Sequence, residues 1–290
     1  MERLWIRFEP HWNAYRLLDS GDGEKLEQFG GYVLRRPEVT AIWPKQLAPS
    51  EWAAADASFF QQDARSGIWK QRRPIKEPWN MVYQLHNHKL TFQLYLTTFK
   101  HVGVFPEQAS NWEFIAERVK QQQQPNVLNL FAYTGGASLA ARASGADVTH
   151  VDSIKPTVTW ANENMVASGL SNIRWMVEDA LTFVKREVKR GKTYTGIIMD
   201  PPAWGSGGVK NQSKWKLEDQ LNDLLENTAK ILDPQGFIVL NTYSGLANST
   251  LETLITSYFR FNTIATGDLI LRSDTEQVLC TGSCLRGWTI

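Results

Sequence analysis

The sequence has few cysteines and no long apolar stretch. Its 290 residues include only Cys280 and Cys284, too few for a disulfide framework or a four-cysteine zinc site. It contains no run of about 18 apolar residues that could cross a membrane. The first residues, MERLWIRFEPHW, place charges where a signal peptide has its apolar core. We therefore expect a cytoplasmic protein whose fold depends on a hydrophobic core.

A large excess of positive charge is also lacking. The formal net charge is +1, whereas a protein that mainly coats nucleic acid is usually strongly basic. Positive residues do cluster locally, in a first group of Arg65, Lys70, Arg72, Arg73 and Lys76 and a second of Lys185, Arg186, Lys189, Arg190 and Lys192. Each group is either ordinary solvated surface or a local patch for phosphate groups.

The segment QQQQP at 121–125 divides the chain into two differently patterned parts. Before it, short apolar alternations at 82–85, 90–97 and 102–105 predict strands, and a helix is expected near 111–121. We expect a small β-rich (α+β) domain over 1–110 and a second domain over 111–290.

After Pro125 the sequence alternates between strand and helix patterns. Apolar runs of strand length occur at 127–132, 148–152, 173–177, 196–200 and 237–242, and helical periodicity occurs at 136–144, 155–168, 180–190, 217–232 and 248–258. This alternation predicts an α/β fold with a parallel, doubly wound sheet. Strands at 263–271 and 277–285 are separated only by a hairpin-length link, so an antiparallel strand should complete a seven-stranded sheet.

Polar or glycine residues follow each of the first four strands of this domain. Gly135 and Gly136 allow a sharp turn and a close approach of the backbone to a ligand. Asp152 ends the second strand, where a carboxylate can accept hydrogen bonds from a ribose diol. The third strand ends in Glu178-Asp179, where an acid can accept from an exocyclic amine.

The fourth strand ends in Asp200-Pro201-Pro202. Two prolines fix the backbone and remove two amide donors, which leaves carbonyl oxygens to accept from an incoming amine. Each strand end alone is also explained by a turn or a helix cap. Together they are what one nucleoside ligand needs, because ligands of such sheets bind beyond the carboxyl ends of the strands.

The segments NLFAYTGGASLAA, VDSIKPTVTWANENM, IRWMVEDALTFVKRE and GIIMDPPAWG resemble the class I S-adenosylmethionine-dependent methyltransferases. More narrowly, they resemble the bacterial group related to large-subunit ribosomal RNA methyltransferases, in a subgroup without the PUA module. The similarity runs from residue 101 onward and includes HVGVFPEQASNW, VKNQSKWKLEDQL and NTYSGL. The resemblance implies a Rossmann-like class I methyltransferase sheet and S-adenosylmethionine as cofactor.

The resemblance also implies roles for individual residues. Tyr133, Gly135 and Ala137 would line the methionine part of the cofactor, Asp152 would hold the ribose, and Asp179 the adenine amine. Asp200 and the Pro201 carbonyl would face the methyl group, and Glu107 and Gln108 would approach from the N-terminal side. The expected cofactor-binding set is Phe131, Tyr133, Thr134, Gly135, Ala137, Asp152, Ser153, Asp179, Ala180, Asp200, Glu107 and Gln108, with Asp200, Pro201 and Pro202 as the catalytic set.

The methyl acceptor is less constrained by the sequence. A nitrogen acceptor is favoured, because a cytosine C5 acceptor needs a nucleophilic cysteine and the fifth strand is followed by Thr242-Tyr243-Ser244. We interpret Cys280 and Cys284 as buried small residues on one face of the last strand. An RNA base is the favoured substrate, contacted by Trp204, Lys210, Lys214 and Tyr243, although Trp204 fits a core or lid position equally well.

Other functions remain as alternatives. A nicotinamide-dependent oxidoreductase would need G-x-G-x-x-G, but Ala137, Ser138 and Leu139 follow the two glycines. A non-catalytic nucleoside-binding protein would have no use for Asp200-Pro201-Pro202. Within the methyltransferases, a protein side chain or a small molecule is the alternative acceptor. No metal site is expected from His86, His88 and His101, because no matching ligand spacing accompanies them.

Overall fold

A computed structural model describes residues 1–63, 66–205 and 215–289. The chain forms two compact units, and both are discontinuous in sequence. The larger unit consists of Met1–Phe8, Ser110–Leu269 and Gly282–Ile290, and the smaller unit of Glu9–Ala109 and Ile270–Thr281.

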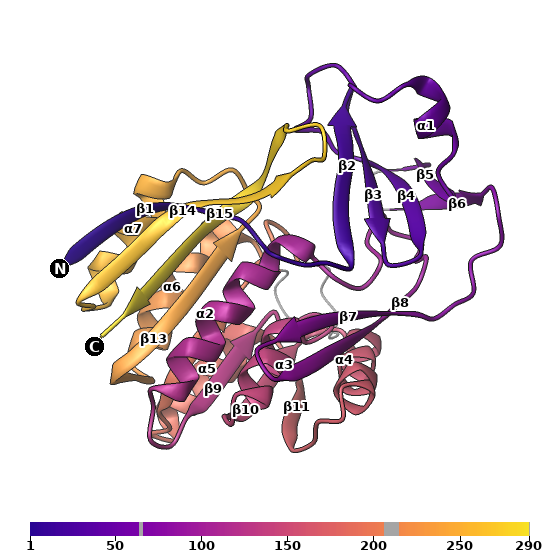
Figure 1. Cartoon of the computed structure of the whole chain (residues 1–290). Coiled ribbons are helices and arrows are strands. Elements are labelled where there is room, and N and C mark those ends of the chain that lie inside the picture. The colour runs from indigo at the N-terminus through magenta and orange to yellow at the C-terminus, as the bar shows by residue number, and fades with distance from the viewer. Residues whose placement is uncertain (64–65, 206–214, 290) are drawn as a thin grey trace. The chain divides into compact units, whose positions relative to one another are not determined.

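The larger unit is built on an eight-stranded sheet with the order β1-β14-β15-β13-β12-β9-β10-β11 (Figure 1). Its strands are β1 Glu2–Phe8, β9 Asn126–Leu130, β10 Asp147–Asp152, β11 Ile173–Val177, β12 Tyr194–Met199, β13 Leu232–Thr242, β14 Thr263–Arg272 and β15 Val278–Trp288. Strands β9 to β13 pair in parallel, and β15 pairs antiparallel with β13. The expected α/β fold with an antiparallel last strand is confirmed. The eighth strand is β1, which pairs in parallel with β14.

Helices connect and cover these strands. They are α2 Ala109–Lys120, α3 Gly136–Ala143, α4 Lys155–Ala167, α5 Ala180–Lys189, α6 Leu217–Ala229 and α7 Asn248–Tyr258. Figure 1 shows α2 on one face of the sheet and α6 on the other. Leu181, Phe183 and Val184 of α5 pack with Leu221 and Leu224 of α6 in a large buried cluster. This apolar packing holds the sheet rigid, so the strand ends have fixed positions.

The smaller unit is β-rich, as its sequence predicts. A five-stranded sheet has the order β2-β3-β4-β5-β6, and β7 and β8 form a separate hairpin. The elements are β2 Tyr15–Gly21, β3 Glu24–Phe29, β4 Tyr32–Pro37, α1 Pro49–Ala53, β5 Ala57–Gln61, β6 Gly67–Gln71, β7 Trp79–Leu85, β8 His88–Leu94 and the 3₁₀ helix η1 Pro106–Gln108. Buried aromatic rings form much of its core, since Tyr15 packs edge-on against Phe29 and Trp12 against Tyr83.

The strand expected at 102–105 is wrong. The Val102 carbonyl accepts a hydrogen bond from the Tyr95 amide, as in a strand pair, but Gly103 then adopts a φ of 112°. That left-handed conformation interrupts an extended chain, and residues 106–108 turn into η1.

Candidate active site

The four strands that carry the expected site residues are neighbours in the sheet. Their order is β12-β9-β10-β11, and all four are parallel. Leu130 pairs with both Val151 and Met199, and Asp152 pairs with Val177. The segments that begin at Phe131, Asp152, Glu178 and Asp200 therefore leave the same edge of the sheet side by side.

The loop after β9 holds an unusual backbone conformation. Phe131, Tyr133 and Gly135 have φ values of 54°, 49° and 90°. Positive φ is common for glycine but strained for aromatic residues, and such strain persists where the surroundings impose it. Two hydrogen bonds do so here: the Tyr133 amide donates to Asp152 Oδ2 at 2.9 Å, and Asn164 Nδ2 donates to the Thr134 carbonyl at 3.0 Å. The loop is a preformed turn.

Asp152 ties this loop to its own strand end. Its Oδ1 accepts from the Ile154 amide at 2.9 Å, and its Oδ2 accepts from the Tyr133 amide. Burial raises the pKa of this carboxyl, and the two amide bonds act in the opposite direction. Each carboxylate oxygen can accept a second hydrogen bond, so the group retains acceptor capacity for a ribose diol. Ser153 follows it and is half-buried.

The structure separates the two acids that follow β11. Glu178 forms an ion pair with Arg186, whereas Asp179 is the N-cap of α5 and accepts from the Thr182 amide through Oδ1 at 2.8 Å. Ala180, the first residue of α5, is buried. Asp179 is therefore a helix cap, which is one of the two explanations that the sequence allowed for an acid at a strand end. Only Oδ1 takes part in the cap.

A buried polar chain lies beneath the glycine turn. Asn129 Nδ2 donates to Ser138 Oγ at 2.9 Å, and Ser138 Oγ lies 3.0 Å from His150 Nδ1. Because Ser138 Oγ accepts from Asn129, its hydroxyl proton is available to His150. A Cβ placed on Gly135 would lie 3.8 Å from His150 Cε1 and 3.2 Å from Ala161 Cβ. The polar chain therefore supports the turn from below.

Gly136 is required by close packing. It begins α3, and a Cβ on it would approach Trp112 Cζ2 to 2.7 Å, closer than real contacts allow. The next residue, Ala137, is half-buried in the first turn of α3. This glycine brings the start of α3 against α2, and so fixes where the turn ends.

The segment after β12 presents one tryptophan and buries another. Trp204 is 69% exposed, whereas Trp215 is buried. Trp215 Nε1 donates to the Pro202 carbonyl at 2.7 Å, and its ring lies 4.8 Å from that of Phe131. The core position considered for Trp204 is therefore wrong, because Trp215 takes it. Lys216 Nζ lies 5.0 Å from the centre of the Trp204 ring.

The remaining residues expected to contact substrate or cofactor lie in different environments. Tyr243, just after β13, is exposed, and a Cβ on Gly282 would lie 2.9 Å from Tyr243 Cδ1. Lys210 and Lys214 lie outside the described residues. Glu107 and Gln108 form part of η1 in the smaller unit and are buried, and their approach to a cofactor stays a prediction.

The two cysteines do not share one environment. Cys284 is buried and Cys280 is exposed, so the expectation that both are buried is wrong for Cys280. The pairing of β15 with β13 begins at Ser283, and Cys280 precedes this paired stretch. Burial raises the pKa of the Cys284 thiol to about 11, which keeps it protonated and poorly nucleophilic at neutral pH.

The fold brings an acid to the first basic group. Arg72 Nη2 and Arg73 Nε lie 3.2 Å and 2.5 Å from Asp56 Oδ1, although the stretch 65–76 that carries them contains no acid. In the second group, Lys185 pairs with Asp223 and Arg186 with Glu178. Arg65 lies outside the described residues. Much of the local positive charge is therefore neutralised by partners that the sequence does not place nearby.

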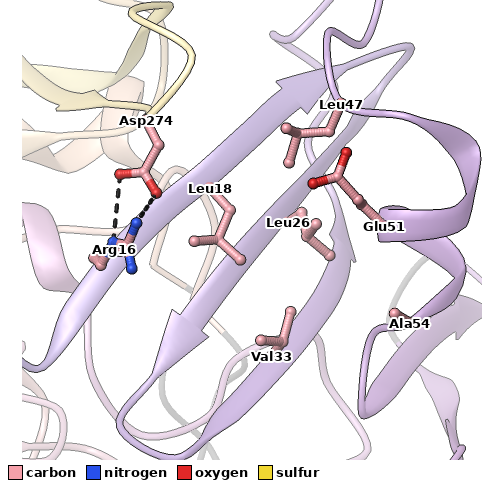
Figure 2. A pocket seen from close by; sticks show the side chains of 8 residues that line it. All are labelled: Arg16, Leu18, Leu26, Val33, Leu47, Glu51, Ala54 and Asp274. Atoms are coloured by element: carbon pink, nitrogen blue, oxygen red, sulfur yellow. Dashed lines mark hydrogen bonds and ion pairs between the residues drawn. The ribbon is translucent and has the colours of Figure 1, made fainter.

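A pocket of about 350 Å³ hollows the smaller unit beside β2, β3 and β4. Figure 2 shows an apolar floor with an ion pair between Arg16 and Asp274 at one side and Glu51 at the other. The floor residues are Leu18, Leu26, Val33 and Leu47. None of the expected site residues lines this pocket, and two of its three charged lining residues, Arg16 and Asp274, are paired with each other.

Two general features limit the chemistry of the described residues. Over 1–63, 66–205 and 215–289, no three His, Cys, Asp or Glu side chains gather as a metal site requires. In the same ranges, no helix is both long and apolar enough to cross a membrane.

Sequence reasoning missed the polar chain and Lys216. Asn129 and His150 are polar residues within otherwise apolar strand sequences, NVLNL and DVTHVD, and such residues indicate buried hydrogen bonding. Lys216 lies next to Trp204 because the two residues form an isolated antiparallel β-bridge. No local sequence pattern predicts such a bridge.

Comparison with known proteins agrees with this geometry. The family model for S-adenosylmethionine-dependent methyltransferases matches residues 46–239. A SAM-dependent methyltransferase from Agrobacterium tumefaciens of known structure is 36% identical, with a TM-score of 0.89 over 100% of this chain and 94% of that one. A Thermus thermophilus 16S rRNA N2 G1207 methyltransferase, solved with AdoMet and guanosine, shares the fold at 17% identity and a TM-score of 0.50, over 81% of this chain and 58% of that one.

Among curated sequences, the ribosomal RNA large subunit methyltransferase K/L of Pseudoalteromonas atlantica is 33% identical over 82% of this chain and 35% of its own length. That of Shewanella frigidimarina is 30% identical over 56% of this chain and 22% of its own length. The chain thus spans about a third or less of these relatives. The match to the family model, together with the strand-end residues, shows that this chain belongs to the S-adenosylmethionine-dependent methyltransferases.

Proposed function

We propose that this protein transfers a methyl group from S-adenosylmethionine to a base nitrogen in RNA, such as ribosomal RNA. The observation that carries the choice of acceptor is Trp204, exposed two residues after Pro202 with Lys216 beside its ring. An exposed aromatic ring can stack on an unpaired base, and an ammonium group beside it can contact phosphate. The names of the ribosomal RNA relatives support the same substrate class.

The residues at the strand ends fit the cofactor. The turn at Phe131–Gly135 allows close approach of a ligand to the backbone, Asp152 has acceptor capacity for a ribose, and the second oxygen of Asp179 can accept from an adenine amine. When bound, S-adenosylmethionine supplies an electrophilic methyl group. The expected site also includes Thr134, Gly135, Ala137, Ser153 and Ala180 as neighbours of these groups.

Asp200 and the Pro201 carbonyl are assigned to the acceptor nitrogen. The Pro202 carbonyl accepts from Trp215, so its role is to anchor this segment. A hydrogen bond from the acceptor amine to Asp200 would orient the lone pair of the amine toward the methyl group, and the Asp200 carboxylate would accept the amine proton after transfer. Positioning of this kind can supply about 7–11 kcal/mol of barrier lowering. Tyr243 is assigned to the substrate side because its ring is exposed at the end of β13.

The direct test is incubation with S-adenosylmethionine labelled in its methyl group and separate RNA, protein and metabolite fractions. We expect label in RNA, and nucleoside mass spectrometry should locate it on a base nitrogen. Trp204→Ala should lower transfer, Trp204→Phe should retain most of it, and both should bind S-adenosylhomocysteine normally. Label in protein or metabolites alone would refute the RNA substrate, and cofactor binding with no transfer to any fraction would favour a non-catalytic nucleoside-binding protein.

A further inference from the structure

The outward face of the β5–β6 hairpin is an exposed apolar and cationic surface. Phe60 on β5 pairs with Ile68 on β6, and their side chains are 43% and 42% exposed. Lys70 Nζ lies 4.8 Å from the centre of the Phe60 ring. Phe60, Ile68 and Lys70 are called the hairpin surface below.

The opposite face of the same hairpin is firmly held. Phe59 is buried and packs edge-on against Trp69, with ring centres 5.3 Å apart. Trp69 Nε1 donates to the Thr97 carbonyl at 2.8 Å, and the Gly67 amide donates to the Thr98 carbonyl at 2.9 Å. Because the inner side chains are fixed, Phe60 and Ile68 are held outward and cannot turn into the core.

Lys70 differs from Arg72 and Arg73, the two described arginines of the same sequence cluster. Arg72 and Arg73 are bound to Asp56, and Arg72 Nε also donates to the Ala54 carbonyl at 3.0 Å. Within the part of the chain that the structure describes, Lys70 has no carboxylate partner. The two strands, ASFFQ and GIWKQ, contain no acidic residue. The charge of the hairpin surface is therefore positive.

We propose that the hairpin surface binds single-stranded RNA, with one base stacked on Phe60 and Lys70 on an adjacent phosphate. Stacking on an aromatic ring is available to every base, and a nearby cation adds the backbone contact. The exposed contact between Lys70 and Phe60 is weak in water, so Lys70 can exchange the ring for a phosphate at small cost. This inference rests on RNA being the substrate class, and it assigns the smaller unit to substrate binding.

Affinity for a labelled single-stranded RNA of about twelve nucleotides, measured by fluorescence anisotropy with the full chain, tests the proposal. Phe60→Ala should weaken binding roughly 5- to 150-fold, as expected for one lost stack, and Phe60→Tyr should restore it. Lys70→Ala should reduce the slope of log affinity against log salt by about 0.7, the value for one phosphate contact to a single strand, whereas Phe60→Ala should leave the slope unchanged. Val82→Ala and Lys89→Ala, which change exposed residues of the separate β7–β8 hairpin, should resemble wild type.

Three results would overturn the proposal. Wild-type RNA affinity in both Phe60→Ala and Lys70→Ala, with RNA still methylated, would refute the hairpin surface and leave the proposed function intact. Dissociation of a wild-type dimer by Phe60→Ala in sedimentation, without a change in RNA affinity, would show that the surface joins two copies of the chain. If wild type neither binds nor methylates RNA, the proposed substrate fails as well. Unchanged S-adenosylhomocysteine affinity in every variant would verify that the methyltransferase unit is folded.

Discussion

The Tyr133 amide and the Asp152 carboxylate are joined by a 2.9 Å hydrogen bond that links the ends of β9 and β10. Tyr133 has a φ of 49°, a conformation that an aromatic residue adopts only when it is held there. The same carboxylate accepts from the Ile154 amide. Asp152 therefore supports the loop after β9 in addition to its proposed contact with the cofactor ribose. Its replacement tests both roles at once.

Asp152→Ala should weaken S-adenosylhomocysteine binding at least about tenfold, because a hydrogen bond to a charged group contributes roughly 1.5–3 kcal/mol. Calorimetry measures this directly. Asp152→Asn keeps one acceptor oxygen and should lose less. Equal affinity in wild type and Asp152→Ala would refute the assignment to the ribose.

The affinity of the wild-type protein for S-adenosylhomocysteine should fall in mild acid. Burial raises the pKa of Asp152, so this carboxylate becomes protonated at a higher pH than an ordinary aspartate and loses acceptor capacity there. Titrations between pH 7 and pH 4 should show weaker binding as pH falls. In Asp152→Asn the component due to this group should be absent, and an identical pH dependence in both proteins would contradict the explanation.

Stability against unfolding should also decrease in acid because of His150. Burial lowers its pKa to about 3 from 6.5. Between these values the unfolded chain binds a proton that the folded chain does not, so the free energy of unfolding falls as pH decreases, by at most about 1.4 kcal/mol per pH unit for one group. His101 has the same shift and should add to the effect. His150→Gln should flatten the curve of unfolding free energy against pH, measured by urea denaturation, and an unchanged slope would exclude His150 as a cause.

Gly136→Ala should destabilise the protein by about 1–3 kcal/mol, because its new methyl group would overlap the Trp112 ring. S-adenosylhomocysteine affinity should fall with it as the start of α3 shifts. Gly31→Ala is the control, since a Cβ there meets nothing within 4 Å. Thermal unfolding of both variants decides the point, and equal melting temperatures would show that α3 adjusts without cost.

The cysteines should react at different rates with a thiol reagent. Exposed Cys280 should be modified in the native protein, and buried Cys284, with its pKa near 11, only on unfolding. The variant Cys280→Ala, Cys284→Ser should retain most methyl transfer. Abolished transfer with normal cofactor binding would instead indicate a catalytic cysteine.

The strand–helix alternation after residue 125 was predictable because buried parallel strands are short apolar runs and their helices have a different period. For example, the helix expected at 155–168 agrees within one residue with α4 at Lys155–Ala167. The sequence also indicated that the residues at the ends of β9 to β12 lie close together, because these four strands are neighbours in the sheet. These elements depend mainly on local sequence.

Features that depend on distant partners were not predictable. Asp56 lies far enough from Arg72 in sequence that only the β5–β6 pairing brings them together. The burial of Trp215 in place of Trp204 likewise depends on the Pro202 carbonyl and the Phe131 ring. The exposure of Phe60 follows from which face of β5 is covered, and the sequence SFFQ does not specify that face.

The pairing of β1 with β14 has a consequence for synthesis on the ribosome. Glu2 pairs with Thr263 and Phe8 with Leu269, so β1 is made long before β14, the strand with which it pairs. Neither unit has all its segments until translation has passed residue 269, because the smaller one also includes Ile270–Thr281. At roughly 5–20 residues per second, the first strand spends on the order of ten seconds or more without its partner. In the finished sheet β1 is an edge strand with one side paired to β14, whereas during that interval both of its sides are unpaired and available for pairing with another chain.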